Sequence, residues 1–215
     1  TFTLTHSSTP FSSSDIVVST GSISNFSSSS SKVYSVIYSP PATSSGTVLF
    51  FVDDNSFYDS SNNGNVSSTL EVNFDTISPT LPSFTHDHDD LIVNGEDTVV
   101  FTVTFSEDMT ATPTINIESI SENDIENALM TATSSSVWTY SWNVPGGKNG
   151  AFSATVSGTD LFGNYYAGTD SVTFTVDNTD PTITLVENDV DDTLIIGETV
   201  LLTASADETI AGTPT

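Results

Sequence analysis

The chain is 215 residues long and carries 28 acidic residues against two basic ones, Lys32 and Lys148, for a formal net charge of −26. Nucleic acid is excluded as a partner because two lysines cannot neutralise a row of phosphates, and an anionic membrane surface is excluded on the same ground. The absence of cysteine excludes disulfides and thiolate metal sites. A charge of this sign attracts cations, which favours a saline exterior that contains calcium.

Short runs rich in β-branched and aromatic residues alternate with clusters of Ser, Gly, Pro and Asn, which is typical of strands and turns. In the first third of the chain we expect strands at 1–6, 15–18, 32–38, 47–52 and 69–74. The serine run Ser27–Ser31 lies between two of these strands and is expected to be a hairpin loop. No apolar run of about 20 residues is present, so no membrane insertion is expected in this fragment.

The middle of the chain continues as short strands, expected at 98–105, 114–120, 128–133, 137–144, 151–156 and 171–176. Within 137–144 the side chains of Trp138, Tyr140 and Trp142 share one face, which favours a place in the core. One segment, Ser121–Met130, could form a helical turn, because its acidic residues lack strand character. No stretch keeps a period of 3.6 residues, so the chain is predicted to be all-β.

A repeat sets the organisation. Residues 75–96 and 177–198, overlaid without a gap, share eight of 22 positions, and a period near 100 residues indicates tandem domains. Val200–Ala206 likewise matches Val99–Phe105. We therefore expect three units, at 1–77, 78–178 and 179–215. The first would lack its first strand, and the third would hold only the opening strands of a further repeat.

Three motifs make the chain similar to a known family. Phe101–Asp108 resembles that family's second strand and acidic turn, Asp160–Asn164 and its counterpart Asp59–Asn63 resemble a D-x-x-G-N loop, and Val172–Thr182 resembles its domain-joining segment. The family is that of the bacterial Ig-like repeats of large surface adhesins and S-layer-type proteins. The resemblance implies tandem immunoglobulin-like β-sandwiches at a cell surface, outside the cell. Asn62 departs from the loop's glycine, but asparagine also tolerates the left-handed conformation.

Clustered carboxylates at the domain junctions predict bound Ca²⁺, which prefers six to eight oxygen ligands. Ig topology brings the loop after the first strand to the outgoing pole of its domain, and the loops after the second and sixth strands to the incoming pole. The second junction is the stronger candidate; its acidic residues are Asp177, Asp180, Asp87, Asp89, Asp90, Asp189, Asp191, Asp192, Asp207 and Glu208. At the first junction Asp75 is expected to meet Glu107, Asp108 and Asp160, with Ser78 in the place of Asp180.

Simpler roles remain open for each motif. Asx side chains also stabilise turns without any metal, and this is the favoured role of Asp59 and Asp160. His86 and His88 flank Asp87 and could bind zinc, but the third unit has Asn188 and Val190 at those places, so the favoured role is that of solvated loop histidines. No nucleophile elbow, zinc-protease motif or phosphate loop is present, so no enzyme is expected. Asn25 and Asn65 fit the acceptor pattern for N-glycosylation.

Three functions follow from these features. The first is a structural repeat module of a long surface protein, such as an adhesin stalk, stiffened by calcium and in contact with neighbouring repeats. The second is a self-assembling S-layer or filament subunit, completed by strand exchange between copies. The third is a carbohydrate-binding accessory module, which requires Trp138, Tyr140 or Trp142 to be exposed to a glycan or surface ligand.

Overall fold

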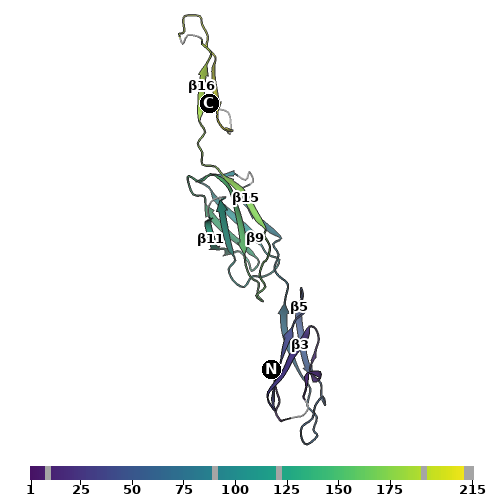
Figure 1. The fold of residues 1–215 in the computed structure, drawn as a ribbon. Coiled ribbons are helices and arrows are strands. Elements are labelled where there is room, and N and C mark those ends of the chain that lie inside the picture. Colours follow the sequence, from purple (N-terminus) through teal and green to yellow (C-terminus); the bar gives the residue numbers. More distant parts are fainter. Residues whose placement is uncertain (8–10, 89–91, 120–122, 190–192, 211–215) are drawn as a thin grey trace.

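The computed structural model describes residues 1–7, 11–88, 92–119, 123–189 and 193–210. The fold is all-β, and its sheets form three groups that follow one another along an elongated molecule (Figure 1). We refer to these groups as the first, second and third units. Within the described residues, no helix is long and apolar enough to cross a membrane.

The first unit contains two three-stranded sheets, in the orders β1-β4-β3 and β2-β5-β6. Its strands are β1 (Phe2–Thr3), β2 (Val17–Val18), β3 (Ser22–Ser30), β4 (Val33–Ser39), β5 (Ser45–Val52) and β6 (Ser68–Asp75), with a 3-10 turn at Ser13–Asp15. Phe11, Ile16, Tyr34 and Val52 form a small buried cluster between the sheets. Thus β1 and β6 lie at the edges of different sheets.

The second unit is a sandwich of a four-stranded sheet, β12-β13-β9-β7, and a five-stranded sheet, β11-β10-β14-β15-β8. Its strands are β7 (Ser83–His86), β8 (Ile92–Val93), β9 (Thr98–Thr104), β10 (Thr114–Ser119), β11 (Asn123–Leu129), β12 (Thr131–Ala132), β13 (Val137–Asn143), β14 (Gly150–Ser157) and β15 (Ser171–Val176). The opening segment serves both sheets, because β7 pairs antiparallel with β9 while β8 pairs parallel with β15.

The core of the second unit follows from alternation along its strands. Val99, Phe101 and Val103 of β9 are fully buried in one core cluster with Phe152 of β14, while the residues between them are only partly buried. Trp138 and Trp142 are also buried, at 8% and 4% exposure. The aromatic stripe predicted to be core is therefore core.

The third unit consists of a single hairpin in its described part. β16 (Ile183–Glu187) pairs antiparallel with β17 (Leu202–Ala206). Every side chain of β16 is exposed, because one face of a lone hairpin has no second sheet to pack against. Isolated two-stranded hairpins are marginally stable in water.

Two sequence predictions of local structure are wrong. The expected loop Ser27–Ser31 instead continues strand β3 to Ser30, with register shifts against β4; pairing with β4 outweighs the turn tendency of serine. The expected helical turn at Ser121–Met130 is strand β11 where it is described, paired with β10 through a bulge. An edge strand that faces solvent tolerates acidic residues, so their presence did not exclude a strand.

The gap-free alignment of residues 75–96 with residues 177–198 is also wrong within the strands. Val100 N donates to Asp87 Oδ1 at 2.9 Å, and Leu201 N donates to Asn188 Oδ1 at 2.8 Å. Asp87 thus corresponds to Asn188 and not to Asp189. Thr80 and Thr182 are equivalent, because each carbonyl accepts from the backbone of the turn after the next strand. Three residues lie between Thr80 and Phe84, but only two lie between Thr182 and Leu185, which pairs as Phe84 does. The second unit therefore has one extra residue before Phe84. The shared D-x-D-D letters therefore do not mark equivalent positions.

The burial of Phe101 gives a test of the sandwich core. Phe101→Ala should lower the free energy of unfolding of the second unit by about 3–5 kcal/mol, because it leaves a cavity between the sheets. Leu129→Ala, at a side chain that is 68% exposed, should cost less than about 0.5 kcal/mol. Both tryptophans lie in this unit, so tryptophan fluorescence in a denaturant titration reports it specifically. Equal losses in the two variants would contradict the packing described above.

Candidate cation site at the first junction

The chain between the first and second units is anchored on both sides. Thr76 is bound to the first unit, since its Oγ1 donates to Pro41 O at 2.7 Å and its N–H to Ser44 O at 2.9 Å. Thr80 is bound to the second unit, since it exchanges hydrogen bonds with Ser106. Only Ile77, Ser78 and Pro79 lie between these anchors, and Pro79 is buried. A proline and the residue before it have restricted dihedrals, so this linker is short and stiff.

Three carboxylates converge beside this linker. Asp75 ends β6 of the first unit, Glu107 lies in the loop after β9, and Asp160 follows β14 of the second unit. One carboxylate oxygen from each lies within 4.8 Å of the others. Within the described residues this is the one group of three or more His, Asp or Glu side chains close enough to share an ion. The group therefore joins two units.

Asp160 is held in place by its own loop. Its Oδ1 accepts hydrogen bonds from Phe162 N at 2.7 Å and Asn164 N at 2.8 Å, and its Oδ2 accepts from Asn164 Nδ2 at 2.7 Å. Gly163 has a φ of +92° in this turn. Although burial raises the pKa of Asp160, these bonds, foremost that from the Asn164 side chain, hold it below the usual value. Asp160 is 1% exposed, so it is a buried, ionised carboxylate.

The first unit repeats this loop at its outer pole. Asp59 Oδ1 accepts from Ser61 N at 2.8 Å and Asn63 N at 2.9 Å. Asn62 takes the left-handed conformation, with a φ of +63°, at the place of Gly163. The bond from the Asn63 side chain is the main reason that the pKa of Asp59 is lowered. The turn role predicted for both Asp residues is present in both loops.

Glu107 shows the opposite electrostatics. Burial raises its pKa, and the negative charges of Asp160 and Asp75 raise it further. In the absence of a cation, its proton is retained to a higher pH than usual because an ionised Glu107 would face two other carboxylates. A divalent ion placed among the three groups would remove that repulsion.

The residues fit a hard cation. Two oxygens bound to one calcium ion lie at most about 4.6–5.2 Å apart, because each Ca–O bond is about 2.3–2.6 Å long. The separation of 4.8 Å or less among the three carboxylates meets this limit. Three carboxylates supply three to six oxygens, so water or backbone carbonyls would complete the shell. The absence of thiol and imidazole among these three ligands favours Ca²⁺ over zinc.

Asp108, also predicted for this junction, does not join the group. Its Oδ1 accepts a hydrogen bond from Ser135 Oγ at 2.5 Å, and the backbone of Met109 on its other side bonds to Ser135. Asp108 therefore fixes the loop after β9 to the turn before β13. Its neighbour Glu107 is the residue of this pair that reaches the cluster.

At the second junction, the predicted carboxylates that are described do not form a group of three close enough to share an ion. Asp177 Oδ1 accepts from Thr179 N, Asp207 accepts from Thr182, and Asp87 accepts from Val100 N and pairs with His88 at 3.0 Å. Asp180, Asp189 and Glu208 complete the described residues predicted here. Asp89, Asp90, Asp191 and Asp192 lie outside the described residues. A metal at this junction stays a prediction.

The segment from Ile92 to Gly95, which follows the D-x-D-D loop in the sequence, lies at the outgoing pole of the second unit. Asp177 N donates to Val93 O at 2.9 Å, and Gly95 N donates to Asn178 Oδ1 at 2.5 Å. Burial raises the pKa of Asp87, but the Val100 amide and His88 lower it more, so the net shift is downward. Asp87 therefore acts as an ionised acceptor inside its own unit.

His86 and His88 have structural contacts. The His86 ring packs on Phe174 at a centroid distance of 5.8 Å, and its Nδ1 accepts from His88 N at 3.2 Å. The His88 ring lies between Asp87, at 3.0 Å, and Asp97, at 4.0 Å. These contacts tie β7 to the turn that follows β8.

Sequence reasoning missed the asparagines that hold the junctions together. Asn164 Nδ2 donates to Asp75 O at 3.2 Å and so crosses the first junction. Asn178 Nδ2 donates to Lys148 O at 2.6 Å, and its N–H donates to Asn149 Oδ1 at 2.6 Å. The signal was present, since Asn164 ends the Asp160–Asn164 motif and Asn178 directly follows Asp177 in the domain-joining segment. Only the fold shows which backbone group each amide meets.

Comparison with known proteins supports the resemblance seen in the sequence. Residues 1–76 match the family model described as a bacterial Ig-like domain. No curated protein matches the chain. The predicted all-β, immunoglobulin-like fold is thus confirmed, and the match ends at the junction where Asp75 meets Glu107 and Asp160.

The raised pKa of Glu107 predicts a pH dependence in chelator. The folded state binds the Glu107 proton more tightly than the unfolded state, so this group's contribution to stability is present at low pH. This contribution is lost as the pH rises from about 4.3, the pKa of a glutamate in the unfolded chain, through the raised pKa of Glu107 in the folded state. Glu107→Gln should therefore be more stable than the wild type at pH 7 in chelator.

The measurement is the denaturation midpoint of the second unit, followed by tryptophan fluorescence at several pH values. Asp108→Asn is the matched control, because Asp108 lies next to Glu107 but is bound to Ser135, and it should not gain stability at pH 7. If Glu107→Gln proves less stable than the wild type there, the three carboxylates do not repel one another as described.

Proposed function

We propose that this chain, whose residues 1–76 form a bacterial Ig-like domain, is a structural repeat module of a long extracellular surface protein, such as an adhesin stalk. In this role each Ig-like unit is a spacer, and a cation at the first junction fixes the angle between two units. Bacterial Ig-like domains are structural modules without enzymatic activity, in keeping with the absence of catalytic motifs from the sequence.

The observation that carries the proposal is the group of Asp75, Glu107 and Asp160. Asp75 belongs to the last strand of one unit, and the other two belong to loops of the next. A cation bound there would replace mutual repulsion by attraction to a shared positive charge. Because the ligands come from two units, binding would hold those units together and would not merely stabilise one loop.

The chain's own residues prepare this site. The Asx loop keeps the Asp160 carboxylate ionised and oriented, and Asn164 of the same loop donates to Asp75 O across the junction. Asp75 Oδ1 accepts from Ile77 N at 2.8 Å, which turns the chain into the linker. Interdomain interfaces usually permit relative motion. Here the stiff Ser78-Pro79 pair limits that motion, and a cation would limit it further.

A carbohydrate-binding role is less well supported. It depended on exposed aromatic side chains, yet Trp138 and Trp142 are 8% and 4% exposed and belong to the core of the second unit. Tyr140, on the same face, packs against that core. A sugar ring needs an accessible aromatic face for stacking, so this strand offers no platform.

Calcium should stabilise the first junction measurably. At a free Ca²⁺ concentration about 100-fold above its Kd, the bound ion should add about 2.7 kcal/mol to the free energy of unfolding, and excess chelator should remove this gain. Solution scattering should show a wider range of interdomain angles in chelator. No change in either the melting temperature or the scattering curve would rule out a stiffening ion.

Variants locate the ion at this junction. Glu107→Gln and Asp75→Asn should each weaken Ca²⁺ binding, measured by titration calorimetry, by about tenfold or more, which is about 1.4 kcal/mol. Asp108→Asn removes a carboxylate of the same loop that lies outside the group, and it should leave the affinity unchanged. If all three variants lose affinity equally, general charge and not this group attracts the ion.

A further inference from the structure

An asparagine followed by a glycine occurs three times in the chain, at Asn63-Gly64, Asn94-Gly95 and Asn149-Gly150. In such a step the backbone nitrogen of the glycine can attack the side-chain Cγ of the asparagine, because glycine has no Cβ to hinder the approach. The attack closes a succinimide ring and releases ammonia, and water then opens the ring to aspartate or isoaspartate. The surroundings of each step decide whether it reacts in the folded protein.

The carboxamide oxygen of Asn149 accepts two hydrogen bonds from the segment that joins the second and third units. Asn178 N donates to Asn149 Oδ1 at 2.6 Å, and Thr179 Oγ1 donates to the same oxygen at 3.2 Å. Attack on Cγ moves negative charge onto this oxygen, and donors that already point at a developing oxyanion lower the barrier to its formation. The fold therefore activates the Asn149 amide toward attack.

Gly150 has room to make this attack. Its φ is +113°, and a Cβ placed on it would have no atom of the described chain within 4 Å, its direct neighbours apart. Gly150 is the first residue of β14, so its rotation disturbs only the end of the ladder. Both Asn149 and Gly150 are exposed, so water reaches the ring that forms.

The Asn94-Gly95 step lacks this freedom. Gly95 N donates to Asn178 Oδ1 at 2.5 Å, and a Cβ on Gly95 would lie 2.8 Å from Gly146 Cα. The attacking nitrogen is thus engaged by an acceptor, and its backbone is packed against another turn. The fold therefore protects Asn94.

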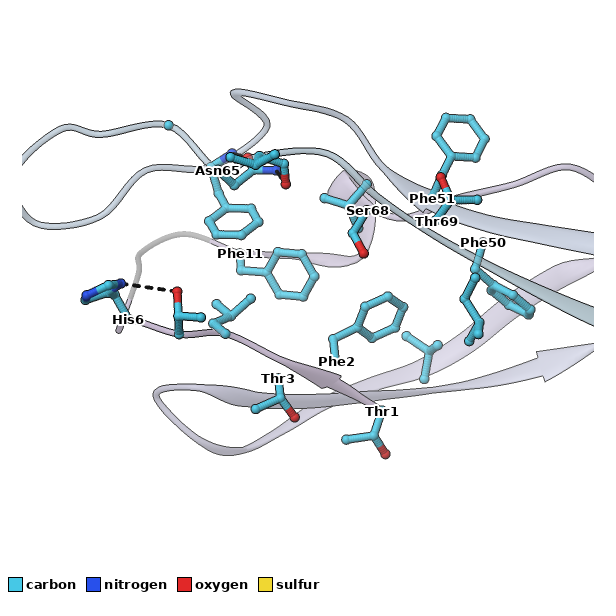
Figure 2. A pocket seen from close by; sticks show the side chains of 18 of the residues that line it. Thr1, Phe2, Thr3, His6, Phe11, Phe50, Phe51, Asn65, Ser68 and Thr69 are labelled. Atoms are coloured by element: carbon cyan, nitrogen blue, oxygen red, sulfur yellow. Dashed lines mark hydrogen bonds between the residues drawn. The ribbon is translucent and has the colours of Figure 1, made fainter.

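The Asn63-Gly64 step is held next to an anion. Asn63 Nδ2 donates to Asp59 Oδ2 at 3.0 Å, so a carboxylate lies beside the place where the oxyanion would form and repels it. A Cβ on Gly64 would collide with the side chain of Asn55. The loop is fixed further by Asn65 (Figure 2), whose amide is hydrogen-bonded to backbone atoms of the preceding turn. The fold therefore protects Asn63 as well.

We propose that Asn149 is a site of self-modification, which converts to aspartate and isoaspartate in the folded protein faster than the other two Asn-Gly steps. Gly150 N loses its proton and forms a bond to Asn149 Cγ, while Nδ2 takes up a proton and leaves as ammonia. Water then adds to one carbonyl of the ring. Opening at Cγ gives aspartate, and opening at the backbone carbonyl of Asn149 gives isoaspartate. Water is the only co-reactant.

The modification changes the second junction. Aspartate keeps an oxygen that can accept from Asn178 N and Thr179 Oγ1, and it adds a negative charge to a junction that already carries Asp177 and Asp180. Isoaspartate lengthens the main chain before β14 and moves the acceptor away from both donors. The attachment of the joining segment to the second unit therefore changes with the age of the protein.

Timed incubation of the 215-residue chain at mildly alkaline pH tests the proposal. Heavy-oxygen water labels each succinimide that is hydrolysed, and peptide mapping by mass spectrometry reads the three steps in one sample. In the folded chain Asn149 should react at least about tenfold faster than Asn63 and Asn94, because it alone combines a free glycine with two donors to its oxygen. In urea the three steps should react at similar rates, and Asn149 should react more slowly than in the folded chain.

Two variants test the role of the donors. Thr179→Val removes one donor to Asn149 Oδ1 and should slow the reaction severalfold. Thr182→Val is the matched control, because the Thr182 hydroxyl donates to Asp207, and it should leave the rate unchanged. Both threonines are exposed, so both variants should fold.

The proposal is overturned if Asn149 reacts no faster than Asn63 and Asn94, or if it reacts more slowly in the folded chain than in urea. Equal rates in Thr179→Val and the wild type, or an equal loss in Thr179→Val and Thr182→Val, would also contradict it, because the hydrogen bonds to Asn149 Oδ1 would then not activate the amide.

Discussion

The structure depends on one packing constraint. In a two-sheet sandwich the inner faces are fully buried only when the open side between the two sheets is covered by a strand. In the second unit the segment from β7 to β8 covers this side, because it adds an edge strand to each sheet. It pairs with β9 on one side and with β15 on the other. Around it Phe101, Phe152 and Phe174 are almost completely buried. In the first unit Val72, which pairs with Val48 as Phe174 pairs with Phe152, is 42% exposed, and in the third unit Leu185 of β16 is 72% exposed.

The junctions follow a different principle, since they are built from polar groups. Asn164 connects the first and second units by donating to the Asp75 carbonyl, Thr80 fixes the end of the linker to Ser106 of the second unit, and Asn178 ties the start of the second junction to the Lys148 turn. The linker is short because both of its ends are hydrogen-bonded. Asp75, Glu107 and Asp160 are brought together by this arrangement at a place where their charges repel. A cation site and a stiff linker at the same place would act on the same interdomain angle.

Some features of the site could be read from single residues. The D-x-x-G-N pattern requires a carboxylate that accepts from the two amides that follow, and a residue that tolerates positive φ, and both loops meet these conditions. Other features could not be read in this way. The acidic segment before β12 was predicted as a helical turn, but it pairs as a strand with β10 because an edge strand is free to carry charge. The D-x-D-D letters gave a false alignment because one extra residue precedes β7.

The sequence by itself determined the all-β character, the Ig-like resemblance and the repeat, because strand alternation and turn residues are local signals. It also indicated that carboxylates would gather at junctions, since Ig topology assigns each loop to a pole. Only the tertiary structure decided which carboxylates meet. Asp75, Glu107 and Asp160 are far apart in the chain, and Asp108 turns to Ser135 although it is adjacent to Glu107. The direction of a side chain depends on the partners that other segments bring to it, and those partners are set by strand pairing over distances that no local pattern records.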